Sequence, residues 1–152
     1  REFFIGIGAK AFRPAPEWLA KSLTARATAG ARFVQTQLCF NMDVLRAYMQ
    51  HMVETRLTWR YSVIVSLTPL PSVATARWLK KNLTDSRIPR SVIARLEQAA
   101  DPAREGVAIC AELMREIAEI PGVSGVNLMT TGDPQLLRDA IQASGLRQPA
   151  RG

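Results

Sequence analysis

Short apolar runs alternate with helical segments along the whole chain, and this alternation limits the possible folds more than any other feature. Runs rich in β-branched and aromatic residues predict buried strands at 3–9, 33–40, 61–67 and 123–129. Apolar residues at helical spacing predict helices at about 16–28, 42–55, 73–83, 91–99, 102–120 and 134–144. Strands that alternate with helices pair in parallel through right-handed crossovers, so the chain is expected to be an α/β protein.

Capping residues support these helix limits. Residues of the types that accept hydrogen bonds from the first turn of a helix stand at the expected helix starts. They are Asn41 or Asp43, then Ser72, Asp101 and Asp133. Gly145 has the residue type that most often ends a helix in the left-handed conformation.

Two parallel architectures fit four such units: a small doubly wound sheet, or four consecutive units of a (β/α)8 TIM barrel. A length of 152 residues gives units of about 38, and eight such units make roughly 300 residues, a usual size for these barrels. We therefore predict a partial (β/α)8 barrel at 1–146 and a polar tail at 147–152. Because Arg1 stands directly before a strand and is not a methionine, we expect a fragment or a processed chain.

The net charge of +7 is concentrated in one segment. Residues 56–95 hold eight Lys or Arg against one acid, Asp85. This excess predicts either a phosphate-binding surface or a solvated helix face. The segment contains no recognised nucleic-acid motif, so no nucleic-acid partner is expected. No apolar stretch is long enough to span a bilayer, and we expect a cytoplasmic protein without a membrane partner.

The chain has few side chains that could catalyse a reaction without a cofactor. Cys39 and Cys110 are far apart and His51 is the single histidine, so neither a metal site nor a disulfide framework is expected. No Ser-His-acid set and no pair of carboxylates at strand ends is present. Catalytic residues therefore stay unassigned, and any reaction is expected to need a cofactor.

The first strand contains a glycine pair in the order Gly6-Ile7-Gly8. Its G-x-G-x-x-A spacing matches a dinucleotide fingerprint, but the glycines lie inside the strand and not in the turn that follows it. They are expected either to let a flat ligand approach or to permit tight strand packing.

The second strand carries the most informative pattern. With a period of two, Phe33, Gln35, Gln37 and Cys39 share one face of this strand. A buried amide needs a hydrogen-bond partner, and Gln37 lies near the carboxyl end, where the sites of parallel α/β folds open. The partner is either a ligand or neighbouring backbone.

Residues 29–41, Ala-Gly-Ala-Arg-Phe-Val-Gln-Thr-Gln-Leu-Cys-Phe-Asn, resemble the AGA-x-F-I-x-T-Q-x-x-F-D segment of methylenetetrahydrofolate reductases. The resemblance covers nearly the whole chain and continues at Ile88-Pro89, Leu96-Glu97, Asp101-Pro102, Glu105-Gly106 and 120–126. It looks closest to a divergent bacterial branch. It aligns the four units with strands five to eight, the C-terminal half of the barrel.

The resemblance implies a flavoprotein oxidoreductase of one-carbon metabolism, in which hydride passes from NAD(P)H through FAD to 5,10-methylenetetrahydrofolate and yields 5-methyltetrahydrofolate. On this basis Ala9 and Arg26 are expected beside the FAD, and Gln37 beside the folate and the nicotinamide. Leu67 and Met129, at the ends of the third and fourth strands, are expected to contact substrate. The expected partner is an N-terminal barrel half or a second copy of the chain.

The sequence also departs from the family pattern. Lys10 and Ala11 follow the first strand where the related branch has Asn-Pro, and Val73 replaces a frequent aromatic residue. Met129 and Asp133 stand where the family supplies Tyr and Arg to the folate. These departures favour an alternative, a degenerate barrel half that acts as a folate-binding, flavin-binding or assembly module without catalysis.

Overall fold

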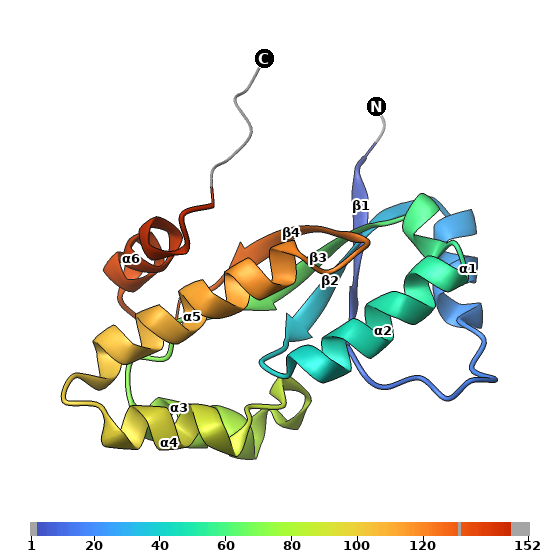
Figure 1. The fold of residues 1–152 in the computed structure, drawn as a ribbon. Helices are drawn as coiled ribbons and strands as arrows, with labels where there is room; N and C mark the ends of the chain where they lie inside the picture. The colour runs from blue at the N-terminus through green and yellow to red at the C-terminus, as the bar shows by residue number, and fades with distance from the viewer. Residues whose placement is uncertain (1–2, 131, 147–152) are drawn as a thin grey trace.

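The computed structural model describes residues 3–130 and 132–146 and contains one four-stranded sheet (Figure 1). Its strands are β1 (Ile5–Ala9), β2 (Ala31–Leu38), β3 (Ser62–Leu67) and β4 (Val123–Leu128). They lie side by side in the order β1-β2-β3-β4, and each neighbouring pair is parallel. A doubly wound sheet reverses its strand order at a switch point, whereas this sheet follows the chain without reversal. The fold is therefore four consecutive βα units of the (β/α)8 barrel type, as predicted.

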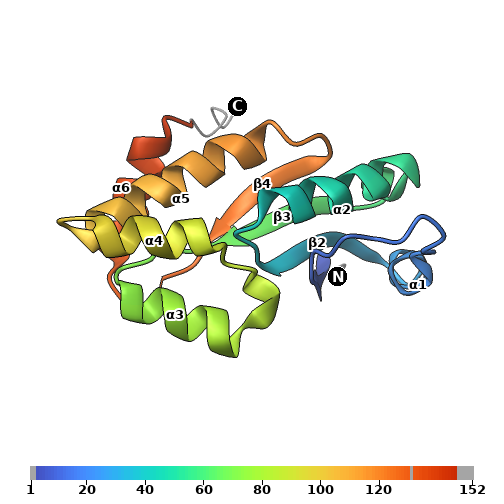
Figure 2. The same ribbon diagram turned by 60° about the horizontal axis from the view of Figure 1, so that its bottom comes forward.

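In the described part of the chain, five α-helices and two 3-10 turns join the strands, and a sixth α-helix follows β4. They are α1 (Lys21–Thr28), α2 (Met42–Glu54), η1 (Leu57–Trp59), α3 (Val73–Asn82), η2 (Thr84–Ser86), α4 (Arg90–Gln98), α5 (Pro102–Ala118) and α6 (Pro134–Ser144). In Figures 1 and 2, α2 and α5 run along the sheet, while α3 and α4 lie beyond the arrowheads of the strands. The carboxyl edge of the sheet therefore faces the segment from α3 to α4.

The predicted caps are confirmed. Three side chains each accept a backbone N–H from their helix at 3.1 Å: Asn41, Ser72 and Asp101. Asp133 does the same at 2.8 Å, and Gly145 ends α6 with φ of 67°. Asn41, not Asp43, is thus the cap of α2.

The first helix begins later than predicted, at Lys21 and not at Pro16. The ring of Trp18 packs edge-on against Phe12, with 4.9 Å between ring centroids, and lies 5.0 Å from the ring of His51. These contacts hold the segment before Lys21 as a loop on α2. The helical spacing that included Trp18 was therefore misleading. The described residues do not include the polar tail predicted at 147–152. They also leave out Arg1 and Thr131.

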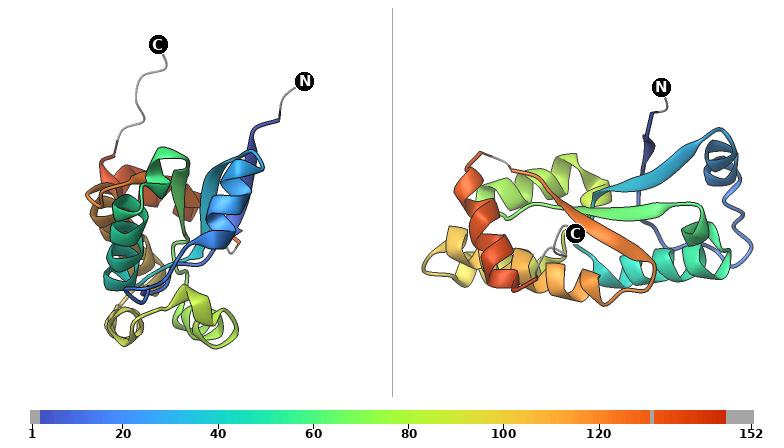
Figure 3. Two further views of the ribbon diagram at one scale, coloured as in Figure 1. Left: turned by 90° about the vertical axis from the view of Figure 1, so that its right-hand side faces the viewer. Right: turned by 90° about the horizontal axis from the view of Figure 1, so that it is seen from above.

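The two faces of the sheet differ in burial. Val63, Val65 and Leu67 of β3 are completely buried under the helices, and α2 and α5 run along this side (Figure 3). On the other face, Gln35 of β2 is half-buried and Gln37 is exposed. Parallel strands are normally covered on both faces. The open face is the one that the interior of a closed barrel would contain.

The basic side chains of segment 56–95 lie at the surface, and two of them form ion pairs that join helices. Arg77 of α3 pairs with Glu97 of α4 at 2.5 Å, and Arg95 of α4 contacts Glu105 and Glu112 of α5 at 2.6 and 2.5 Å. Part of the excess therefore serves helix packing. Within residues 3–130 and 132–146, none of the helices combines the length and hydropathy needed to cross a bilayer.

Gly106 allows α5 to pack closely on the chain that follows β3. A Cβ atom at this position would lie 1.8 Å from the carbonyl oxygen of Leu70 and 2.8 Å from its carbonyl carbon. Both are backbone atoms, which cannot turn away as the end of a side chain could. The glycine is thus required by a close approach of two backbones.

We predict that Gly106→Ala destabilises the protein by about 1–3 kcal/mol, because overpacking has to push α5 from Leu70. An alanine within a helix ordinarily stabilises by about 1 kcal/mol relative to glycine, so the expected sign is reversed. Urea unfolding measures the change. Gly125→Ala is the control, since a Cβ there meets nothing within 4 Å. A Gly106→Ala protein as stable as the original would contradict the packing described.

Candidate functional site

Gln37 and Met129 meet at the carboxyl edge of the sheet, where both line two adjoining cavities. The first, which we call the sheet-face cavity, has a volume of about 380 Å³. It is lined by Gly6, Ile7, Gly8, Phe33, Gln35, Thr36, Gln37 and Met129. The second, the rim cavity, has a volume of about 210 Å³ and reaches from Gln37 to η2. Gln37 is therefore accessible from two sides.

A β-bulge in β2 presents Gln37. The pairing of β2 with β3 shifts between Gln35 and Leu38, so β2 contains one extra residue there. The N–H of Ser66 donates to Thr36 Oγ1 at 3.0 Å, and backbone pairing resumes where Cys39 N–H donates to the Ser66 carbonyl at 3.2 Å. The hydroxyl of Thr36 thus accepts a strand N–H in place of a backbone carbonyl.

The atoms that hold this bulge are buried. Thr36 is 3% exposed and Ser66 is 0% exposed. The Ser66 hydroxyl also accepts a hydrogen bond from Asn127 Nδ2 of β4 at 3.4 Å. A short polar chain therefore joins three strands directly beneath Gln37 and fixes the backbone from which its side chain projects.

The two glycines of β1 have different roles. A Cβ on Gly6 would lie 2.0 Å from the Phe33 ring, whereas one on Gly8 would meet nothing within 4 Å. Phe33 also stacks on Phe4, with 5.3 Å between ring centroids. Of the two expectations from the sequence, tight packing applies to Gly6, and an open flat surface applies to Gly8.

Three residues at the rim were not predicted as site residues: Lys10, Asp85 and Ser86. Lys10 Nζ lies 3.6 Å from Asp85 Oδ1, and the Ser86 carbonyl accepts the N–H of Phe40 at 2.9 Å. These contacts bring η2 to the ends of β1 and β2. Residue type alone carries no signal for this, because the turn depends on Arg87 with φ of 49°.

A comparison with known protein families matches residues 10–145 to methylenetetrahydrofolate reductase. The chain belongs to this family. The match covers most of the chain, including three of the four strands and every described helix. A search of curated proteins found no match. The resemblance carried by the Gln-Thr-Gln strand is therefore confirmed at the level of the family.

The structure places the residues that the family resemblance singled out at different depths. Met129 is 37% exposed beside Gln37, but Leu67 is 0% exposed. Strand alternation puts Leu67 with Val63 and Val65 on the helix side, so its side chain does not line either cavity. Ala9 ends β1, and its side chain packs against the core.

Arg26 lies away from the carboxyl edge. It is in the last turn of α1, which leads into the start of β2. It also lies near Tyr61, the residue before β3, where its positive charge opposes the burial that raises the pKa of the Tyr61 hydroxyl. The structure thus does not bring Arg26 together with Gln37, and its role beside FAD stays a prediction.

Two expectations for β2 were wrong. Gln37 is exposed, so burial does not oblige its amide to find a partner within the protein. Cys39 is 1% exposed and does not share the open face, because β2 ends at Leu38 after the bulge. Burial raises the pKa of the Cys39 thiol, and that of Cys110 to about 12. Neither thiol is poised to act as a nucleophile.

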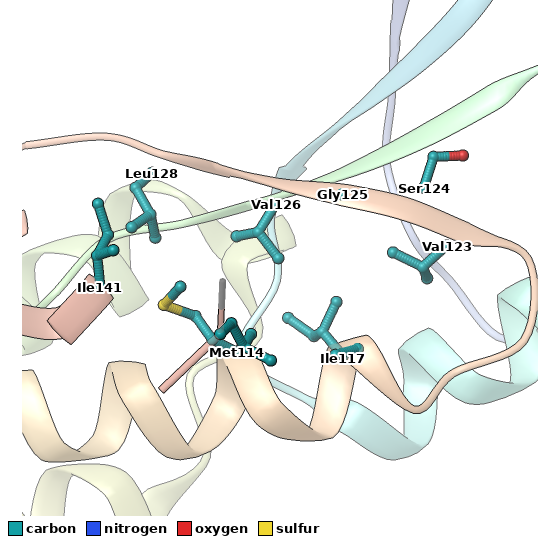
Figure 4. Close-up of a pocket in the computed structure, with 10 residues that line it drawn as sticks. Met114, Ile117, Val123, Ser124, Gly125, Val126, Leu128 and Ile141 are labelled. Atoms are coloured by element: carbon teal, nitrogen blue, oxygen red, sulfur yellow. The ribbon is translucent and has the colours of Figure 1, made fainter. Parts of the chain in front are cut away.

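Another cavity, with a volume of about 510 Å³, lies between β4, α5 and α6 (Figure 4). Val126 and Leu128 point from β4 toward Met114 and Ile117 of α5, whereas Ser124 points to the other side of the strand. The remaining lining side chains are apolar. This groove flanks an edge strand and offers no convergent polar groups, so the carboxyl edge is the better candidate site. Among the described residues, no three His, Cys, Asp or Glu side chains are grouped to hold a metal ion.

We predict that Thr36→Val destabilises the protein by about 1–3 kcal/mol, because it leaves the buried N–H of Ser66 without an acceptor while nearly preserving shape. Thr36→Ser keeps the hydroxyl and should retain that hydrogen bond. Urea unfolding and the exchange rate of the Ser66 amide hydrogen measure both effects. Equal protection of the Ser66 amide in Thr36→Val and Thr36→Ser would show that Thr36 does not hold the bulge.

Proposed function

We propose that this chain supplies the Gln37 side of a flavin-dependent site that reduces a methylenetetrahydrofolate with hydride from NAD(P)H. The observation that carries the proposal is the exposed Gln37, presented by a bulge at the carboxyl edge of a family-matched sheet. Sites of (β/α)8 proteins are built at this edge.

The sheet face fits the flat ring of a flavin. Gly8 leaves bare backbone beside the sheet-face cavity, and the apolar side chain of Met129 stands at its end. Gln35 and Gln37 each offer a carbonyl acceptor and an N–H donor pair along the same cavity. We propose that this surface accommodates the flavin ring or the substrate that lies against it.

The side chains around the sheet-face cavity would bind and orient rather than transfer protons. The described residues of its lining include no carboxylate and no imidazole, and the Thr36 hydroxyl accepts the N–H of Ser66. FAD, when bound, supplies hydride transfer, a reaction that these side chains cannot perform. Gln37 would hold the folate by hydrogen bonds, and Met129 would cover its ring.

The open face and the free edges of β1 and β4 support a site completed by further βα units. Each of these two strands pairs on one side only within the sheet. Four strands cannot close a barrel, and an uncovered parallel edge invites pairing with another chain segment. We propose that a complementary barrel half, or a second copy of the chain, covers this face.

A non-catalytic binding or assembly module is the second candidate, and two residues favour it. Asp133 stands where the family supplies an arginine to the folate, and here its carboxylate caps α6. Val73 replaces an aromatic residue and packs partly buried against the core. Both side chains thus serve the fold at positions where ligand contacts were expected.

Flavin absorbance and NAD(P)H oxidation, measured with the complementary barrel half supplied, test the enzymatic proposal. We expect both signals, together with binding of 5-methyltetrahydrofolate. Folate binding without NAD(P)H oxidation would favour the binding module. The absence of flavin absorbance, NAD(P)H oxidation and folate binding would contradict the enzyme and the ligand-binding module, and would leave only the assembly module.

We predict that Gln37→Ala weakens folate binding about tenfold, equivalent to about 1.4 kcal/mol, because it removes the carboxamide from both cavities. Isothermal calorimetry with 5-methyltetrahydrofolate measures the affinity. Gln142→Ala, in the exposed part of α6, is the matched control and should bind as the original chain does. Equal affinities of the Gln37→Ala and Gln142→Ala proteins would exclude Gln37 from the folate site.

A further inference from the structure

We propose that the rim cavity is a binding subsite for an uncharged hydrogen-bonding group, an amide or a hydroxyl, carried on an apolar stem. The cavity lies between the end of β2, the start of η2 and Met129. It is lined by Gln37, Leu38, Asn82, Leu83, Thr84, Asp85, Ser86 and Met129.

The central observation is the hydroxyl of Ser86. Ser86 is 1% exposed, and its Oγ has no hydrogen-bond partner among the described residues. Its backbone, in contrast, is fully engaged. The N–H donates to the Leu83 carbonyl at 2.8 Å, and the carbonyl accepts the N–H of Phe40 at 2.9 Å. Buried polar groups are nearly always paired, so a fixed residue with an unused hydroxyl indicates a partner that is not part of the fold.

The other polar side chains of the cavity differ in whether they already make hydrogen bonds within the protein. The carboxamide of Gln37 is exposed and offers both a donor and an acceptor. The amide of Asn82 already donates to the Trp78 carbonyl at 2.8 Å. Ser86 and Gln37 are thus the groups best placed to bind a ligand here.

The charge balance favours a neutral ligand. Among the described residues that line this cavity, Asp85 alone is ionisable, and Lys10 Nζ lies 3.6 Å from its carboxylate. An anion would meet the Asp85 carboxylate, and a cation would compete with Lys10. Leu38, Leu83 and Met129 supply apolar surface for the stem.

The rim cavity shares two lining residues with the sheet-face cavity, namely Gln37 and Met129. A ligand in either cavity can therefore contact Gln37 and Met129. The subsite is inferred from the Ser86 hydroxyl and its surroundings, and it holds whether or not the ligand on the sheet face is a folate.

Benzamide is a suitable probe, since it joins an uncharged amide to an apolar ring, with benzoate and benzylamine as charged counterparts. NMR titration of the whole chain should show benzamide shifting the side-chain amide signals of Gln37 and the methyl signal of Met129. Both charged compounds should bind more weakly. Ser86→Ala should weaken benzamide binding about fivefold or more, through loss of one hydrogen bond.

Thermal unfolding separates a ligand-binding hydroxyl from a structural one. Ser144 is the matched control: it is 4% exposed, and its hydroxyl donates to the Ile141 carbonyl at 2.7 Å and accepts the Leu146 N–H at 3.2 Å. Ser144→Ala should lower the Tm, whereas Ser86→Ala should leave it unchanged or raise it.

Three results would overturn the proposal. Benzamide could leave Gln37 and Met129 unshifted, Ser86→Ala could bind benzamide as tightly as the original chain, or Ser86→Ala could lower the Tm as much as Ser144→Ala. None of these results depends on folate binding, so failure of the subsite and failure of the proposed function are distinguishable.

Discussion

The hydrogen bond from the Ser66 N–H to Thr36 Oγ1 connects the core of this protein to its candidate site. It lies where β2 carries one residue more than β3, so that a strand N–H would otherwise lose its acceptor. The neighbouring strand pair contains the same device, since β4 has an extra residue at its bulge and Ser124 Oγ accepts the N–H of Val63 at 3.1 Å. Hydroxyl side chains therefore accept strand N–H groups at two of the three register shifts in the sheet. This allows the pairing to change register without leaving buried backbone groups unpaired.

The asymmetry of the sheet explains why function and stability occupy different faces. The helix side contains the apolar side chains of β3 and most of the packed core. The other side carries bare glycine backbone, amide side chains and the two cavities that share Gln37. The cavity between β4, α5 and α6 lies on the helix side and is mostly apolar, as expected for the flank of an edge strand. It is larger than either cavity at the carboxyl edge, but the polar side chains converge at that edge, which is therefore the better candidate site.

Much of the fold was predictable from the sequence, because the apolar periodicity and the caps act locally. Asn41, Ser72, Asp101 and Asp133 cap helices as residue type predicts, and the parallel pairing of the strands follows from the alternation of units. The late start of α1 was not predictable, because it depends on the contact of Trp18 with a ring of α2.

The candidate site was predictable only in part. Gln37 was identified because strand period and family resemblance agree at that position. The burial of Leu67 on the helix side was not predictable, because the end of a strand in sequence does not reveal which face its last side chain occupies. The role of Ser86 depends on a left-handed Arg87 and on the docking of η2 against Phe40, neither of which leaves a pattern in residue types.

The most direct test of the central claim compares two methionine methyl groups in one NMR titration with 5-methyltetrahydrofolate. Met129 lies at the carboxyl edge beside Gln37, and Met114 lines the apolar groove on the helix side. If the open face of the sheet binds the ligand, the Met129 methyl signal shifts with saturation while that of Met114 stays in place. A saturable shift of Met114 with an unchanged Met129 would contradict the assignment of the site to the open face.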